Sequence, residues 1–207
     1  RALVADAALS SAFVPVFSEL LEKGERKRAW RVASTLFWLM LLGLGALSAL
    51  FILIAPLVIS PFHAVDPSLA AGLSRVLFPI VALLGVSGIV VGILNSYDHF
   101  TVPALSPVFW NVAIILGLAL GVPHVSGESG KLYVYAAAIL IATLVQVFLP
   151  MPWLRGRDGK LQLVLDWRDP AVARVFKLML PVTLGLGLIN VNAVIDTLFA
   201  SRFIDKN

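Results

Sequence analysis

Polar side chains that could do chemistry are rare in this sequence, and the clearest group lies in the apolar run GLGLINVNAVIDT at residues 185–197. At 100° per residue, Gly185, Asn192 and Asp196 fall within about 40° of one another on a helix. A second polar stripe lies on roughly the opposite face and contains Thr183, Asn190 and Thr197. If the run crosses a membrane, we expect protein on one side and a wet cavity or an ion site at Asp196 on the other. In the alternative, the amides and threonines bridge neighbouring helices, and Asp196 lies near the outer membrane interface.

Two further charges, Arg1 and Asp6, accompany the otherwise nearly apolar stretch at residues 2–17. Placing an ionisable side chain inside hydrocarbon costs at least a few kcal/mol of free energy, so such a group needs an ion-pair partner or contact with water. If this stretch is the cytoplasmic half of a spanning helix, Arg1 lies at membrane depth. It then requires a cavity or a counter-ion.

Residue types that serve catalysis are scattered along the chain. His63, His99 and His124 stand in separate loops, and Asp98-His99 is the one adjacent pair of an acid and a histidine. The sequence contains no HExxH, GxSxG or P-loop motif and no paired-aspartate metal motif. It also contains no cysteine, which excludes disulfides and thiolate metal sites. We therefore expect a protein that is not an enzyme.

The composition explains why polar groups are so few. Of the 207 residues, 59% are apolar and 14% are charged, against roughly 45–50% and 25% in an average soluble domain. Only five of the 28 charges fall in the 123 residues from 32 to 154. A soluble fold cannot cover its surface with so few charges, so the sequence predicts an integral membrane protein. The net charge of +4 then indicates topology, and we expect no nucleic-acid partner.

Long apolar segments define the elements that must position these residues. A helix needs about 20 apolar residues to cross a bilayer. Five segments meet this requirement, namely 32–60, 76–95, 102–122, 132–154 and 178–200. Since the connections are short, successive helices are predicted to be antiparallel neighbours. The fold class is therefore all-α, a polytopic helical membrane protein.

Lysine and arginine are concentrated in alternate connections. Residues 18–31 contain five, the corner at Asn95 contains none and residues 155–177 contain six. The two loops between them, at Arg75 and Lys131, contain one each, and the C-terminal tail contains two. Because cytoplasmic loops carry an excess of these residues, the first, third and fifth connections are predicted to be cytoplasmic.

The fifth connection, at residues 155–177, shows a pattern of its own. Asp169-Pro170 supplies an N-cap and a first-turn proline for a helix that places Arg174 and Lys177 on one face. We interpret it as an interfacial amphipathic helix that leads into the last membrane segment. The alternative is a solvated linker.

Small residues in the second long segment indicate close helix packing. Gly88 and Gly92 form a GxxxG pair, with Gly85 one turn earlier. Such glycines let helix backbones approach each other closely. We expect a structural role for them.

Three strings in the sequence are distinctive, namely RALVADAALSSAFVPVFSE at 1–19, LFPIVALLGVSGIVVGILNSYDHFTVPALSPVFWN at 77–111 and LPVTLGLGLINVNAVIDTLFAS at 180–201. They resemble the MurJ/MviN family of bacterial lipid II flippases, and the resemblance runs along essentially all 207 residues. The family is part of a superfamily, called MOP, that also contains MATE exporters and polysaccharide flippases.

The resemblance implies about fourteen helices in two lobes that alternate between inward-open and outward-open states around a cationic central cavity. This chain would then extend from the end of the family's second helix to its seventh. Residues 1–154 would contain the end of the second helix and helices three to six of the N-lobe. Residues 155–177 would form the cytoplasmic connection between the lobes, and residues 178–207 the first helix of the C-lobe.

The resemblance also implies roles for individual residues. Arg1 is similar to a cavity arginine that holds the substrate's pyrophosphate, and Asp6 stands where members usually have a glutamate. Asp196 resembles an acid of the seventh helix that contributes to a sodium site in some members, and Asn192 shares its stripe. No cofactor is implied other than this sodium ion.

The function implied is translocation of lipid II, an undecaprenyl-diphosphate-linked disaccharide peptide, across the bacterial inner membrane. The partners expected are lipid II and membrane lipids. Since the chain opens on Arg1 without a methionine, we interpret it as a piece of a longer protein. The alternatives are a related drug/cation antiporter or polysaccharide-lipid flippase of the same superfamily, and a non-transporting membrane scaffold.

Overall fold

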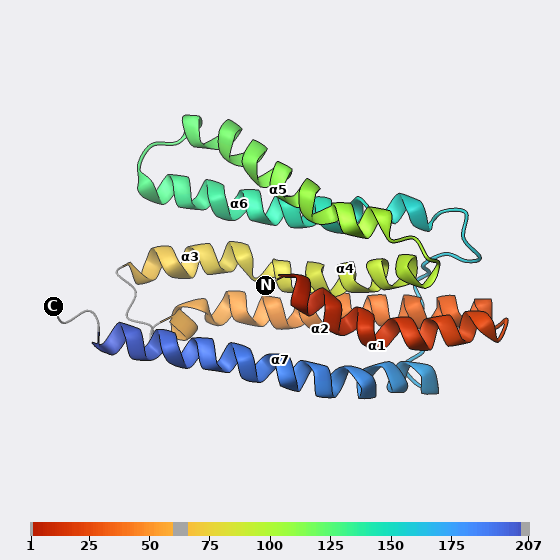
Figure 1. Cartoon of the computed structure of the whole chain (residues 1–207). Helices are drawn as coiled ribbons and strands as arrows, with labels where there is room; N and C mark the ends of the chain where they lie inside the picture. Colours follow the sequence, from red (N-terminus) through yellow and green to blue (C-terminus); the bar gives the residue numbers. More distant parts are fainter. Residues whose placement is uncertain (1, 60–65, 204–207) are drawn as a thin grey trace.

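The computed structural model describes the backbone of residues 2–59 and 66–203 (Figure 1). The side chains of residues 2–10 and of part of the stretch 186–203 lie outside the described residues. The long helices are α1 (Ala2–Glu22), α2 (Arg26–Ile59), α3 (Pro67–Leu77), α4 (Pro79–Ser96), α5 (Thr101–Gly121), α6 (Glu128–Phe148) and α7 (Pro170–Phe203). Two short 3-10 helices, η2 (Val122–His124) and η3 (Met151–Leu154), follow α5 and α6. No strand occurs within the described ranges, and the all-α prediction is confirmed.

The helices lie side by side along one direction (Figure 1). Helix α4 packs against α1 and α2, the α5–α6 hairpin packs on α3 and α4 through α6, and α7 runs along α1 and α2. The connections α1–α2, α4–α5 and α6–α7 all meet at the same end of the bundle. We call this the connector end.

Four stretches are long and apolar enough to cross a membrane, and they have mean hydropathies of 2.0 to 2.6. They are Arg26–Ile59, Pro67–Ser96, Thr101–His124 and Glu128–Leu154. Their outer faces carry large apolar side chains, among them Leu53 of α2 and Ile115 of α5, which are 77% and 64% exposed. In water, such exposed apolar faces would promote aggregation, whereas in lipid they are the expected surface. The chain is a multi-pass membrane protein.

One expected boundary is wrong. Arg75 was expected in a loop, but it lies on α3, where its Nε donates to the carbonyl of Ile52 at 3.2 Å. The helix starts early because Asp66 caps it, accepting the N–H groups of Ser68 and Leu69 at 3.0 Å each, with Pro67 in the first turn. The helix is interrupted at Phe78, before Pro79, although Phe78 keeps helical dihedral angles (φ −55°, ψ −38°). Pro79 has no N–H to donate to the preceding turn.

The predicted N-cap at Asp169 is confirmed, because its Oδ1 accepts the N–H of Ala171 at 2.8 Å. Arg174 and Lys177 are exposed, and Val172 and Val175 on the same turns are buried. This amphipathic stretch is not a separate helix, however. It forms the first turns of α7, which continues past Pro181 to Phe203. The expected boundary between residues 177 and 178 therefore falls inside α7. It separates the amphipathic first turns of this helix from its more apolar remainder.

The main hydrophobic core joins α1, α2, α4 and the first turns of α7. Phe13 and Phe17 of α1 stack with their ring centroids 5.1 Å apart and are fully buried. Gly92 of α4 faces this pair so closely that an added Cβ would lie 2.6 Å from a Phe13 ring carbon. The structural role expected for this glycine is confirmed.

Candidate functional site

The residues proposed for substrate contact lie at the N-terminal part of the chain. Arg1 lies outside the described residues. Asp6 is on the second turn of α1, and its side chain also lies outside the described residues. Helix α1 begins midway along the bundle and ends at the connector end (Figure 1). The roles of Arg1 and Asp6 stay predictions.

Both residues proposed for an ion site are on α7. The side chain of Asn192 lies outside the described residues, whereas Asp196 is described and is exposed. From Pro170 to Asp196 the helix advances about 39 Å at 1.5 Å per residue. Asp196 therefore lies toward the end of the bundle that is away from the connector end. The ion site stays a prediction.

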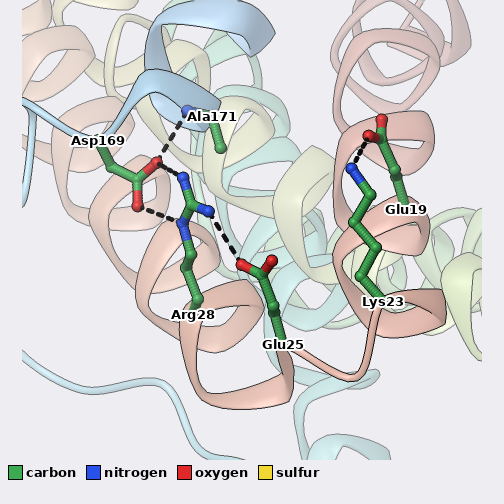
Figure 2. Close-up of polar contacts among 6 residues, drawn as sticks. All are labelled: Glu19, Lys23, Glu25, Arg28, Asp169 and Ala171. Atoms are coloured by element: carbon green, nitrogen blue, oxygen red, sulfur yellow. Dashed lines mark hydrogen bonds and ion pairs between the residues drawn. The ribbon is translucent and has the colours of Figure 1, made fainter.

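A three-residue ion-pair cluster fixes the start of α7 to α2 (Figure 2). Arg28 donates from Nε and Nη2 to the two carboxylate oxygens of Asp169, both at 2.9 Å, and from Nη1 to Glu25 Oε2 at 2.9 Å. The two-point contact matches the planar guanidinium fork to a carboxylate, which gives direction as well as attraction. The Asp169 side chain is only 9% exposed, so solvent screens this pair less than a surface pair.

Asp169 serves α7 as well as Arg28. Its carboxylate bonds the guanidinium and also caps the helix at Ala171. These hydrogen bonds, led by those from Arg28, hold the pKa of Asp169 below its ordinary value of 3.8, against the opposing effect of burial. The carboxylate is therefore ionised throughout the physiological pH range.

A second ion pair joins α1 to α7. Glu19 Oε2 accepts from Arg174 Nη1 at 2.6 Å, and Glu19 Oε1 accepts from Lys23 Nζ at 2.6 Å, the latter drawn in Figure 2. Arg174 and Glu19 are 155 residues apart in the chain. We call this contact the α1–α7 seam. It joins the first turns of α7 to the last turns of α1.

The extended segment 160–169 is held along α2 by buried hydroxyls. Ser34 Oγ accepts the N–H of Gln162, and Thr35 Oγ1 accepts the N–H of Asp166, both at 3.0 Å. Trp38 Nε1 donates to the carbonyl of Gln162 at 2.9 Å. Ser34 and Thr35 are at most 1% exposed. Each hydroxyl accepts a backbone N–H of the connection, which lies in no helix or sheet and therefore has no partner from secondary structure.

A third group of polar contacts attaches residue 158 to the other two connections. Asp158 accepts from Arg26 Nη1 at 2.7 Å and from the Tyr97 hydroxyl at 3.2 Å. Trp30 Nε1 donates to the same hydroxyl at 3.2 Å. The first, third and fifth connections are therefore joined at one end of the molecule, as expected for connections on one side of a membrane. That this side is cytoplasmic stays a prediction.

Chemically, the polar contacts described at the connector end hold distant segments of the chain together. Glu19, Asp158 and Asp169 are engaged in ion pairs or a helix cap, and no group of three or more His, Cys, Asp or Glu residues that could hold a metal ion occurs among the described residues. Sequence reasoning placed the charges at this end but missed their pairing. Composition alone cannot show that Glu19, Asp158 and Asp169 each meet an arginine more than 130 residues away.

The chain is similar along nearly its whole length to proteins of one family. A family model described as "Lipid II flippase MurJ" matches residues 1–206. The chain is 30% identical over 209 residues to "Probable lipid II flippase MurJ" of Buchnera aphidicola subsp. Acyrthosiphon pisum (strain APS), covering 97% of this chain and 40% of the relative.

Two further relatives give the same result. "Lipid II flippase MurJ" of Burkholderia cenocepacia is 28% identical over 212 residues, with 98% of this chain and 40% of the relative covered. The protein named "Probable lipid II flippase MurJ" from Vibrio cholerae is 30% identical over 215 residues, with 97% and 40% covered. The chain thus spans about 40% of the length of these curated relatives.

Proposed function

Because the chain belongs to the lipid II flippase MurJ family, we propose that it forms the first lobe and the inter-lobe connection of a protein that moves lipid II across the bacterial inner membrane. The observation that carries this proposal is the family match over residues 1–206. It favours a lipid II flippase over the drug/cation antiporters and polysaccharide-lipid flippases considered from the sequence. Residues 1–154 belong to the first lobe in this proposal, and residues 178–207 open the second.

The physical task of such a protein is to shield a polar head group from hydrocarbon. Lipid II carries a diphosphate and a sugar-peptide head group, so its passage requires a hydrated, positively lined cavity and a lipid-facing groove for the tail. Arginine suits the diphosphate because its fork is permanently charged and bidentate. We assign this role to Arg1, with Asp6 five residues further along the chain. No covalent bond is made or broken.

Alternating access requires that the two lobes separate at one membrane face and then at the other. The α1–α7 seam closes the connector end, and the excess of lysine and arginine there favours a cytoplasmic location. In this proposal the Glu19–Arg174 pair breaks when the cytoplasmic side opens and forms again when it closes. A partly exposed ion pair suits this use because its net contribution to stability is small.

Coupling to sodium is part of the proposal, with Asp196 and Asn192 as ligands on α7. A carboxylate and an amide oxygen are hard donors of the kind that bind such cations. Translocation by the intact protein is then expected to slow in sodium-free buffer, and Asp196→Asn is expected to remove that dependence. Unchanged translocation in both cases would exclude the site.

The substrate role of Arg1 is tested in the intact protein that contains this chain. Arg1→Ala is expected to abolish growth of cells depleted of their own flippase, and Arg1→Lys to retain part of it, since lysine keeps the charge but not the fork. Translocation of labelled lipid II into vesicles gives the direct measurement. Arg168→Ala, which removes an exposed arginine of the connection, is the matched control and is expected to behave as the unaltered protein. Full activity of Arg1→Ala would contradict the role.

A further inference from the structure

A cavity of about 790 Å³ opens at the connector end, beyond the last turn of α6. Its walls are Trp30 of α2, the short helix η3 and the segment 155–161. An adjoining hollow of about 290 Å³ shares Trp30 and Lys160 with it and extends to Lys27 and Arg31 of α2. We call the two together the connector cavity.

The charges that line the connector cavity are unbalanced. Five cations line it, namely Lys27, Arg31, Arg155, Arg157 and Lys160, against one carboxylate, Asp158. That carboxylate is already engaged, since it accepts from Arg26 and from Tyr97. Within the described part of the chain, none of the five lining cations forms an ion pair with an acid. The cavity therefore attracts an anion that can contact several of these cations at once.

The rest of the lining is apolar and lies beside surfaces typical of a membrane interface. Met151, Leu154 and Leu161 form an apolar wall next to the basic groups. On the same connection, Leu163 and Trp167 are 79% and 70% exposed. Exposed tryptophan and leucine beside the ends of membrane-spanning helices are typical of the headgroup region.

From these observations we infer that the connector cavity binds the phosphate of an anionic phospholipid in the adjacent leaflet. The cations contact the phosphodiester, and the apolar wall receives the glycerol and the upper acyl chain. Basic pockets between membrane helices have this combination of properties when they recognise lipid headgroups. A soluble phosphate would satisfy the cations but leave the apolar wall in water.

Such a lipid would also link two parts of the protein. Lys27 and Arg31 are on α2, whereas Arg155, Arg157 and Lys160 belong to the connection. A phosphate between them would screen their mutual repulsion and add a contact between the connection and α2. No residue of α1 or α7 lines the connector cavity. The proposed lipid site is therefore separate from the place proposed for the substrate, at Arg1 and Asp6.

The test is a titration calorimetry experiment on the intact protein in detergent, with dihexanoyl-phosphatidylglycerol as the probe. Dihexanoyl-phosphatidylcholine and inorganic phosphate are titrated in parallel. The cavity variant is Arg31→Gln with Lys160→Gln. The matched control, Arg168→Gln with Lys177→Gln, removes one arginine and one lysine from exposed positions that do not line the cavity.

We expect the cavity variant to bind phosphatidylglycerol about 30-fold more weakly, because each lysine or arginine near an anionic lipid contributes about fivefold. The control is expected to bind within about threefold of the unaltered protein, and phosphatidylcholine to bind weakly to all three. Equal losses in both variants would show diffuse charge attraction and overturn the proposal. Inorganic phosphate that competes as well as the lipid would assign the cavity to a soluble anion and would also overturn it. Unchanged thermal unfolding of both variants confirms that folding is intact.

Discussion

Asp169 has two functions at the connector end. It receives two hydrogen bonds from Arg28 and caps α7 through Ala171. An N-cap requires only an acceptor oxygen, whereas the pair with Arg28 requires the negative charge. The two functions of one side chain can therefore be separated by substitution.

At this scale we predict that Asp169→Ala is less stable than Asp169→Asn by about 1 kcal/mol, because asparagine keeps the cap and alanine does not. Both variants are expected to be less stable than the unaltered protein at neutral pH. The measurement is thermal unfolding of the intact protein in detergent. Equal melting temperatures for the two variants would contradict the separate role of the cap.

The pH dependence of stability has a definite sign for the same residue. Arg28 holds the pKa of Asp169 below 3.8 in the folded protein. A carboxylate with a lowered folded pKa stabilises the fold at pH values above its unfolded pKa, and this contribution is lost as the pH falls through the folded value. We therefore expect the stability difference between the unaltered protein and Asp169→Asn to be constant at neutral pH and to shrink below about pH 4.

Among the elements, α1 and α4 pack through a glycine that meets an aromatic pair. Gly92 leaves room for the Phe13 ring, and Gly85 faces Leu44 of α2 on the same side of α4. Because a core this dense cannot take an added methyl group without a shift, the contact is selective for glycine.

We predict that Gly92→Ala lowers the stability of the intact protein by about 1–3 kcal/mol, through overpacking against Phe13. Gly43→Ala on α2 is the control, since nothing lies within 4 Å of an added Cβ there. It is expected to be neutral or slightly stabilising, because alanine is the better helix former. Thermal unfolding compares the two variants. A similar effect of both substitutions would contradict the packing argument.

At the scale of the whole molecule, the α1–α7 seam is where the proposed second lobe meets the first. Arg174, in the first turns of α7, pairs with Glu19 of α1, and the buried Val172 and Val175 place these turns in the core that α1, α2 and α4 form. A transport cycle in which the lobes separate at this end requires the seam to open.

We predict that joining Glu19→Cys to Arg174→Cys with a short, reducible bifunctional thiol reagent stops lipid II translocation, and that reduction restores it. Since this chain contains no cysteine, none has to be removed from it. The control pair is Glu19→Cys with Lys23→Cys, which lies on α1 alone and is expected to leave translocation unchanged after joining. Full translocation by the joined seam would show that α1 and α7 stay together throughout the cycle.

The sequence alone determined the class of the protein, its membrane-spanning character, the shared side of three connections and the cap at Asp169. These properties depend on local composition and short-range spacing, which a linear chain displays directly. It did not reveal α3, because Asp66 and Pro67 were interpreted as turn residues between two apolar segments, whereas they cap and begin this helix. The proposed roles of Arg1, Asp6, Asn192 and Asp196 rest on family resemblance and stay predictions.

Only the tertiary structure decided which charges meet. Arg28 and Asp169 are 141 residues apart, and Arg174 and Glu19 are 155 apart. Their pairing depends on how α1, α2 and α7 pack, and so does the connector cavity between α2 and residues 155–161. The physical reason is that hydrophobic burial can be read from each segment separately, whereas an ion pair or a cavity exists only after distant segments have come together.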